Sequence, residues 1–151
     1  MRHPAPEGRR GFRLLDHTAD KSIEAWGATL ADLFCAAAEG MFSESVNCSQ
    51  LTPDQEWSIQ VQAASLDDLL HAWLSELLWI AERDEAVLCR FEIAELQGTE
   101  KGPWRARGLA RGGSVPPESP HTGAPVKAVT YHDLHVREDH GVWRTHLVFD
   151  V

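Results

Sequence analysis

The sequence has no long apolar run and few cysteines, and each shortage excludes a class of protein. No segment has the roughly 18 consecutive apolar residues that a membrane-spanning helix needs, so we expect no membrane span. The three cysteines, Cys35, Cys48 and Cys89, are scattered and form no Cys-x-x-Cys pair. Their odd number and spacing argue against a disulfide framework and against a cysteine-rich zinc site. We therefore expect a cytoplasmic protein with reduced thiols.

Positive charge is also scarce. Lysine and arginine total 14, whereas aspartate and glutamate total 23, and the formal net charge is -9. Phosphate backbones repel a chain of this charge, so we expect no tight direct binding to RNA or DNA. A basic protein partner or a bound cation suits this balance better.

Common catalytic motifs are missing as well. The chain has no Gly-x-Gly-x-x-Gly, no phosphate loop ending in Gly-Lys-Ser/Thr, and no Gly-x-Ser-x-Gly nucleophile elbow. No cysteine has neighbours that would activate its thiol. These absences favour a helper protein over an enzyme.

The apolar residues that are present predict two amphipathic helices. Thr29 and Ser65 each have an aspartate three residues later, which is a helix-capping pattern. Apolar residues then recur at helical spacing over 30–41 and 66–81. The helix that follows Ser65 has the longer apolar face.

The rest of the chain predicts strands. The predicted strands lie at 12–15, 22–26, 57–62, 88–97, 104–111, 127–137 and 142–151. Asp139-His140-Gly141 predicts a tight turn that joins the last two as an antiparallel hairpin. A run of strands after the second helix favours an α+β two-layer sandwich, with a largely antiparallel sheet and two helices, over a doubly wound parallel sheet. Residues 1–11 are predicted to be a flexible tail and residues 12–151 the domain.

Two segments could supply metal ligands. Asp16-His17-Thr18-Ala19-Asp20 follows the first predicted strand, and it is either a turn or half of a metal site. Asp150 is predicted to point away from the more apolar face of the last strand, and the terminal carboxylate of Val151 follows it. If the two segments met, a divalent cation would relieve the repulsion between their carboxylates.

A third segment, residues 126–132, contains Lys127, Tyr131 and His132. As a strand it would place His132 on a mainly apolar face, where a hydrogen-bonded core histidine is the usual outcome. His132 and His135 would point to opposite faces and would be poor joint metal ligands.

These segments, Asp16 to Asp20, Val126 to His132 and the closing Phe149-Asp150-Val151, together with the helix over 66–81, resemble the archease family. The resemblance runs from about Phe12 to the last residue. It implies a non-enzymatic, metal-binding accessory protein in tRNA splicing or RNA repair. Such a protein activates an RtcB-type RNA ligase by promoting its guanylylation from GTP, which allows multiple turnover.

The resemblance also implies roles for individual residues. The metal ligands would be Asp20, Asp150 and Val151, and the metal would be calcium, although magnesium or manganese also suit oxygen ligands. Asp16, His17, Lys127, Tyr131 and His132 would lie near the site or contact the partner. The chain departs from the family at Lys21-Ser22, which places a cation beside the proposed site, and at Pro125.

Two other functions stay open. One is a chaperone or modulator of a tRNA methyltransferase or another RNA-modifying enzyme. The other is a metal-dependent phosphoester hydrolase that would use Asp20 and Asp150, with His17 or His132 as a base.

Overall fold

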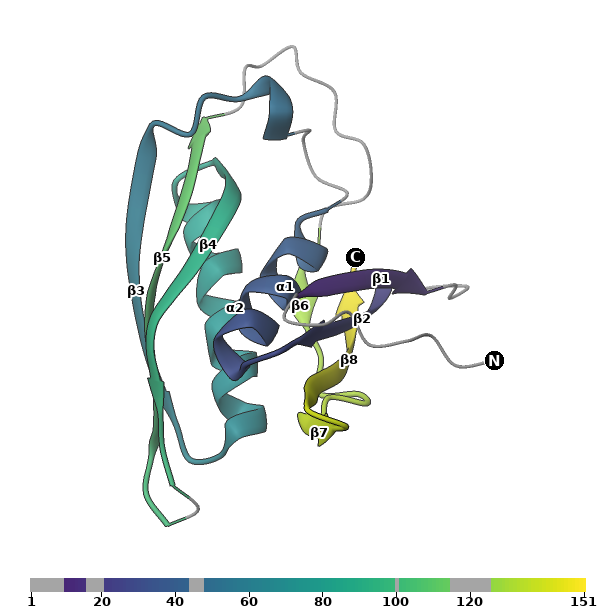
Figure 1. Ribbon diagram of the computed structural model, residues 1–151. Helices are drawn as coiled ribbons and strands as arrows, with labels where there is room; N and C mark the ends of the chain where they lie inside the picture. Colours follow the sequence, from purple (N-terminus) through teal and green to yellow (C-terminus); the bar gives the residue numbers. More distant parts are fainter. Residues whose placement is uncertain (1–9, 16–20, 44–47, 100, 115–125) are drawn as a thin grey trace.

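A computed structural model describes residues 10–15, 21–43, 48–99, 101–114 and 126–151 (Figure 1). No helix among these residues is long and apolar enough to cross a membrane. The elements follow one another as β1 (Gly11–Leu15), β2 (Lys21–Gly27), α1 (Leu30–Met41), the short helical turn η1 (Cys48–Gln50), β3 (Gln55–Ala63), α2 (Leu66–Arg83), β4 (Ala86–Gln97), β5 (Trp104–Ser114), β6 (Ala128–Val129), β7 (Arg137–Asp139) and β8 (Val142–Asp150).

Both helices begin at the predicted capping residues. The Thr29 side chain accepts a hydrogen bond from the backbone N–H of Asp32 at 3.1 Å. The Ser65 side chain accepts one from Asp68 N–H at 3.1 Å. Each bond satisfies a donor that the first helical turn leaves without a partner, so the capping signal in the sequence fixes where each helix starts.

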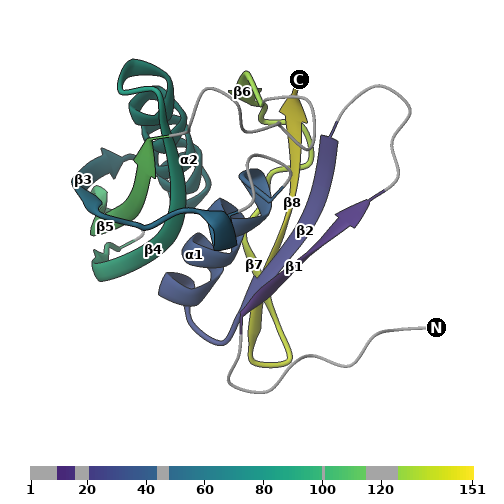
Figure 2. The same cartoon turned by 90° about the horizontal axis from the view of Figure 1, so that it is seen from above.

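The strands form two antiparallel sheets, with the helices packed between them. One sheet has the order β1-β2-β8-β6, with β7 also paired to β8, and the other has the order β3-β5-β4. Helix α1 contacts strands of both sheets, and α2 packs mainly on the three-stranded sheet (Figures 1 and 2). The α+β class is confirmed, with the predicted antiparallel layer divided into two sheets.

The core lies where the helices meet these sheets. Its largest fully buried side chains include Phe34 of α1, Trp73 of α2 and Phe149 of β8. The Trp73 indole N–H donates to the Phe34 carbonyl at 3.1 Å, so its polar atom is satisfied although the ring is buried. Because Phe149 belongs to this core, the end of β8 is held firmly against the domain.

The predicted strand over 127–137 is wrong. Only Ala128–Val129 and Arg137–Asp139 are strands, and between them Leu134 N–H donates to the Tyr131 carbonyl while Asp133 adopts a φ of 59°. The Thr130 hydroxyl donates to Val148 O at 2.9 Å and accepts from His132 N–H at 3.2 Å, which turns the chain. The turn before β8 is confirmed, with positive φ at His140 and Gly141.

The cysteine prediction is also wrong in part. Cys48 of η1 and Cys89 of β4 form a disulfide across a sequence separation of 41 residues. Cys35 is the free thiol and is buried. Spacing along the chain could not predict the pair, because β4 returns to the turn after α1 only when the sheet forms.

Candidate functional site at the end of β8

Three segments from distant parts of the sequence meet at the C-terminal end of β8. Lys21, the first residue of β2, pairs with Phe149 on one side. On the other side Ala128 of β6 pairs with Asp150, and Lys127 N–H donates to the Asp150 carbonyl at 2.7 Å. Figure 2 shows the starts of β2 and β6 on either side of this strand end. The sheet therefore brings Lys127 and Asp150 together, although they are far apart in the chain.

Asp150 and Val151, at the end of β8, are exposed to solvent. Asp150 is exposed, and Val151 keeps 38% of its surface exposed. Phe149, immediately before them, is fully buried. The Asp150 carboxylate is thus attached to a fixed backbone, and carboxylate oxygens are ligands suited to a hard cation. Asp16, His17 and Asp20 lie outside the described residues.

Lys21 places its charge against the C-terminal end of α1. The side chain is 9% exposed, and its ammonium donates to the Met41 carbonyl at 3.1 Å and to the Ser43 hydroxyl at 3.4 Å. Met41 ends α1, where carbonyls without helical partners carry partial negative charge. The cation that the sequence placed beside the site is therefore engaged with the C-terminus of a helix.

The turn after β6 is anchored on α2 by an aromatic stack. The rings of Tyr131 and His71 lie 4.0 Å apart at an interplanar angle of 7°. His71 Nε2 is 2.8 Å from the Val129 carbonyl, which fixes its ring. Burial raises the pKa of Tyr131, and a hydrogen bond with Asp68 raises it further. Tyr131 remains 56% exposed and is available to a partner.

A second anchor lies at the other end of this turn. The Asp67 carboxylate accepts a hydrogen bond from Val136 N–H at 2.7 Å and lies 3.1 Å from His135 Nδ1. His132 is not a core residue, because its side chain is 70% exposed. The support of this turn by Asp67 and His71 could not be predicted from the residue pattern, since acids in a first helical turn are explained by the helix dipole alone.

The metal-ligand chemistry of these residues is that of oxygen donors. Among the described residues, no three His, Cys, Asp or Glu side chains gather into a metal-binding group. Of the predicted ligands, Asp150 and Val151 are described and adjacent, and the Asp150 side chain offers carboxylate oxygens. Such donors fit a hard divalent cation and do not fit a thiolate-type zinc site.

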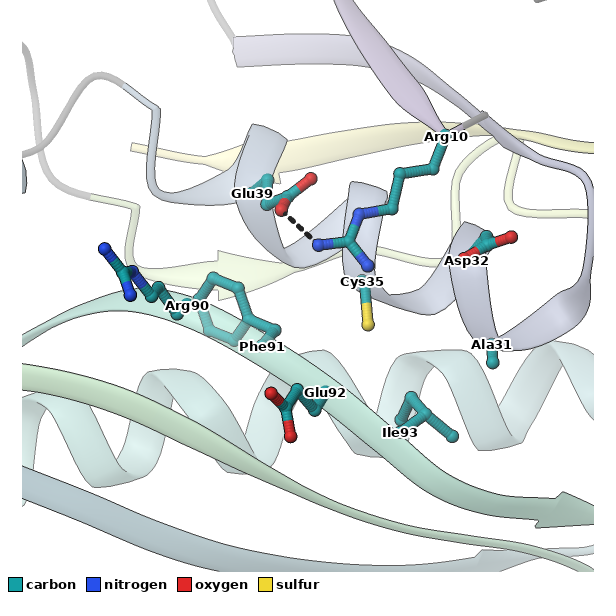
Figure 3. Close-up of a pocket in the computed structure, with 9 residues that line it drawn as sticks. All are labelled: Arg10, Ala31, Asp32, Cys35, Glu39, Arg90, Phe91, Glu92 and Ile93. Atoms are coloured by element: carbon teal, nitrogen blue, oxygen red, sulfur yellow. Dashed lines mark hydrogen bonds and ion pairs between the residues drawn. The ribbon is translucent and has the colours of Figure 1, made fainter. Parts of the chain in front are cut away.

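A separate hollow of about 490 Å³ lies between α1 and β4 (Figure 3). Arg10 spans it and pairs with Glu39 at 2.8 Å. At its floor, burial raises the pKa of the Cys35 thiol to about 11. A thiol that stays protonated at neutral pH is a poor nucleophile, so this hollow is not a cysteine active site.

Comparison with known proteins shows the family. A profile of the Archease protein family (MTH1598/TM1083) matches residues 12–151. The chain belongs to the archease family.

Archease relatives match over nearly the whole chain. The protein archease of Methanosarcina mazei is 33% identical over 146 residues, which are 97% of this chain and 99% of the relative. That of Methanopyrus kandleri is 35% identical over 137 residues, covering 91% and 96% of the two chains. The family match thus includes both the start of β2 and the end of β8.

Solved structures also share the fold. The solution structure of Methanobacterium thermoautotrophicum protein 1598 has a TM-score of 0.82 and 26% identity, and the match covers 93% of this chain and 99% of that one. The crystal structure of an archease from Thermotoga maritima, described as a possible chaperone, has a TM-score of 0.57 and 18% identity, with coverage of 100% and 98%. The second likeness concerns the fold alone.

Proposed function

We propose that this archease-family chain is a metal-binding accessory protein that activates an RtcB-type RNA ligase and has no catalytic chemistry of its own. It promotes guanylylation of the ligase from GTP, so that the ligase turns over repeatedly in tRNA splicing or RNA repair. The observation that carries the proposal is the meeting of Lys127, Asp150 and the start of β2 at one strand end.

The proposed metal ligands are Asp20, Asp150 and Val151. Lys21, which follows Asp20, lies opposite Phe149, so the described neighbours of both aspartates are paired in one sheet. Carboxylate oxygens suit calcium, and magnesium or manganese are the alternatives. When bound, the cation supplies positive charge that phosphate oxygens of a nucleotide can approach.

The exposed residues beside Asp150 form the proposed ligase-contacting surface, made of Lys127, Tyr131 and His132. Lys127 and His132 are exposed, and Tyr131, which is 56% exposed as a residue, holds its ring in a fixed position against His71. A rigid aromatic side chain loses little conformational freedom on binding, which suits it to anchor a protein–protein contact.

The test is RNA ligation by the cognate ligase, with the ligase limiting and this protein absent, substoichiometric or equimolar. We expect a single round of ligation without the protein and many rounds with it. Ligase guanylylation from labelled GTP should rise in parallel. An unchanged ligase at every ratio would contradict the proposal.

The metal assignment needs its own variants. Asp20→Ala and Asp150→Ala should each lower calcium affinity and ligase activation by about tenfold or more, because a carboxylate ligand is lost. Asp54→Ala is the matched control, since it removes an equal charge from an exposed loop residue. If both site variants bound calcium and activated the ligase like the control, the assignment would be wrong.

A chaperone function is the second candidate, because the Thermotoga maritima relative is described as a possible chaperone. It predicts that the protein raises the soluble yield or activity of a tRNA methyltransferase and leaves the ligase unchanged. Phosphoester hydrolysis by the isolated protein, abolished in Asp150→Ala, would instead support the hydrolase reading.

A further inference from the structure

The Cys48–Cys89 disulfide has no part in the proposed function. Its position in the fold suits it to a separate role in redox chemistry. Cys48 opens η1, and Cys89 falls at a bulge in β4, where the register with β5 shifts between Leu88 and Arg90. A bulged residue has no partner in the strand ladder, so the side chain of Cys89 can contact a residue outside the sheet. Both cysteines are partly exposed and can be reached by another thiol.

We infer that Cys48 and Cys89 form a redox modification site, which a dithiol reductant of the thioredoxin type opens and which, once open, frees η1 from β4. A thiolate of the reductant attacks one sulfur, the Cys48–Cys89 bond breaks, and a mixed disulfide forms. The second thiol of the reductant then attacks the reductant's own sulfur in the mixed disulfide, which breaks that bond and releases the remaining cysteine as a thiol. The two cysteines gain two electrons and two protons in all, and the reductant leaves as its disulfide.

The bond is a covalent attachment of the α1-to-β3 connection to β4. At the start of this connection Phe42 also stacks on Phe91 of β4, with ring centroids 5.8 Å apart and an interplanar angle of 11°. With the disulfide open, η1 loses its covalent link to β4, whereas local backbone bonds such as Leu51 N–H to Cys48 O at 3.2 Å remain. We therefore expect residues 48–54 to open more often in the reduced protein.

Ser43, which precedes η1 in the chain, contacts a residue close to the candidate site. Ser43 stands five positions before Cys48 in the chain, and its hydroxyl accepts a hydrogen bond from the Lys21 ammonium at 3.4 Å. Lys21 in turn lies opposite Phe149, next to Asp150. Any effect of the redox state on ligase activation rests on the proposed function, whereas the redox chemistry and the release of η1 do not.

The experiment uses the full chain carrying Cys35→Ser, so that only the two paired cysteines can be labelled. The protein is equilibrated with mixtures of reduced and oxidised dithiothreitol, quenched, treated with N-ethylmaleimide and weighed by mass spectrometry. We expect zero labels at the oxidised end, two at the reduced end, and a single coupled transition between them. Two labels at the oxidised end would overturn the inference, because no bond would have formed.

Hydrogen exchange on the two end states tests the release of η1. Peptides covering residues 48–54 should exchange about tenfold faster after reduction, while α2 peptides stay unchanged. Cys48→Ser without reductant should match the reduced protein in both regions. Equal exchange at residues 48–54 in the two states would overturn the release. No ligase enters either measurement, so failure here is distinct from failure of the proposed function.

Discussion

Cys35 shows how one residue's surroundings decide its reactivity. Its pKa of about 11 follows mainly from burial among α1 and β4, since only 2% of the residue is exposed. Thiolate is the reactive form, and at pH 8 such a thiol is ionised to about one part in a thousand, compared with roughly a quarter for a free cysteine.

We expect iodoacetamide to label Cys35 in the folded, oxidised protein at least about 100-fold more slowly than in urea at pH 8. The rate should rise roughly tenfold per pH unit until the pH approaches 11, because the thiolate fraction rises at that rate. Mass spectrometry of timed samples measures it. Complete labelling of the folded protein within minutes at pH 8 would contradict the burial of this thiol.

Lys21 is the other residue whose surroundings are unusual, because a buried lysine needs partners for its charge. Lys21→Met keeps the volume and removes the bonds to Met41 O and the Ser43 hydroxyl. The free energy of unfolding should fall by about 1.5–3 kcal/mol, measured by urea denaturation. Exposed Lys101→Met is the control and should change it by less than about 0.5 kcal/mol. Equal values for the two variants would mean that Lys21 contributes no net stabilisation.

Among the elements, β4 and β5 depend on two glycines where their backbones approach closely. A Cβ on Gly108 would overlap the Glu92 carbonyl, and one on Gly112 would overlap the Val87 carbonyl. Both positions adjoin the register shifts of β4. Backbone atoms cannot move aside as a flexible side chain can, so these two strands need glycine here.

Gly108→Ala should therefore destabilise the domain by about 3 kcal/mol or more, or prevent it from folding. Gly102→Ala is the matched control, because its Cβ would meet only the Thr99 side chain, at 3.3 Å. Circular dichroism during urea unfolding measures both variants. If Gly108→Ala were as stable as the control, β4 and β5 would be able to move apart at this position without a fall in the free energy of unfolding.

Elements with local signals were predictable from the sequence, and elements that depend on distant contacts were not. The helices start at Thr29 and Ser65 because each cap and its partner lie three residues apart. The predicted strand over 127–137 failed because the Thr130 hydroxyl bonds Val148, on a strand 18 residues away. The disulfide was missed for the same reason, since η1 and β4 approach each other only in the folded chain.

The candidate site was predictable only as separate pieces. Asp150 and Lys127 stood out in the sequence, but the Lys127–Asp150 backbone bond depends on β6 pairing with β8. Asp67 and His71, which hold the turn after β6, lie on a helix that looked purely structural. Which residues lie together at the candidate site thus depends on the register of the sheet, which residue types alone do not predict.

At the scale of the whole molecule, the net charge of -9 governs how the protein would meet a basic partner. Salt screens such attraction, with a Debye length of about 10 Å at 0.1 M and about 3 Å at 1 M. We expect the concentration of this protein that half-activates the ligase to rise several-fold between about 0.05 and about 0.3 M salt, because salt screens the attraction.

The measurement is a ligation titration at each salt concentration, with the unassisted ligase as the control for direct salt effects. Chloride and acetate salts should give the same trend, because screening depends on ionic strength. A half-activating concentration that stays constant would contradict electrostatic docking, and the partner surface would then have to be sought among apolar contacts.

The position of β8 in its sheet also affects how the protein is made. This strand lies between β2 and β6, and β7 pairs with it too, yet it leaves the ribosome after every other strand that the structure describes. While its residues are still being translated, β2 has β1 as its described strand partner and the five-stranded sheet is incomplete. The two helices and the β3-β5-β4 sheet emerge earlier and can assemble first. A nascent chain stalled before Val142 would therefore expose the face of α1 that β8 covers, and chaperones would recognise that stalled chain.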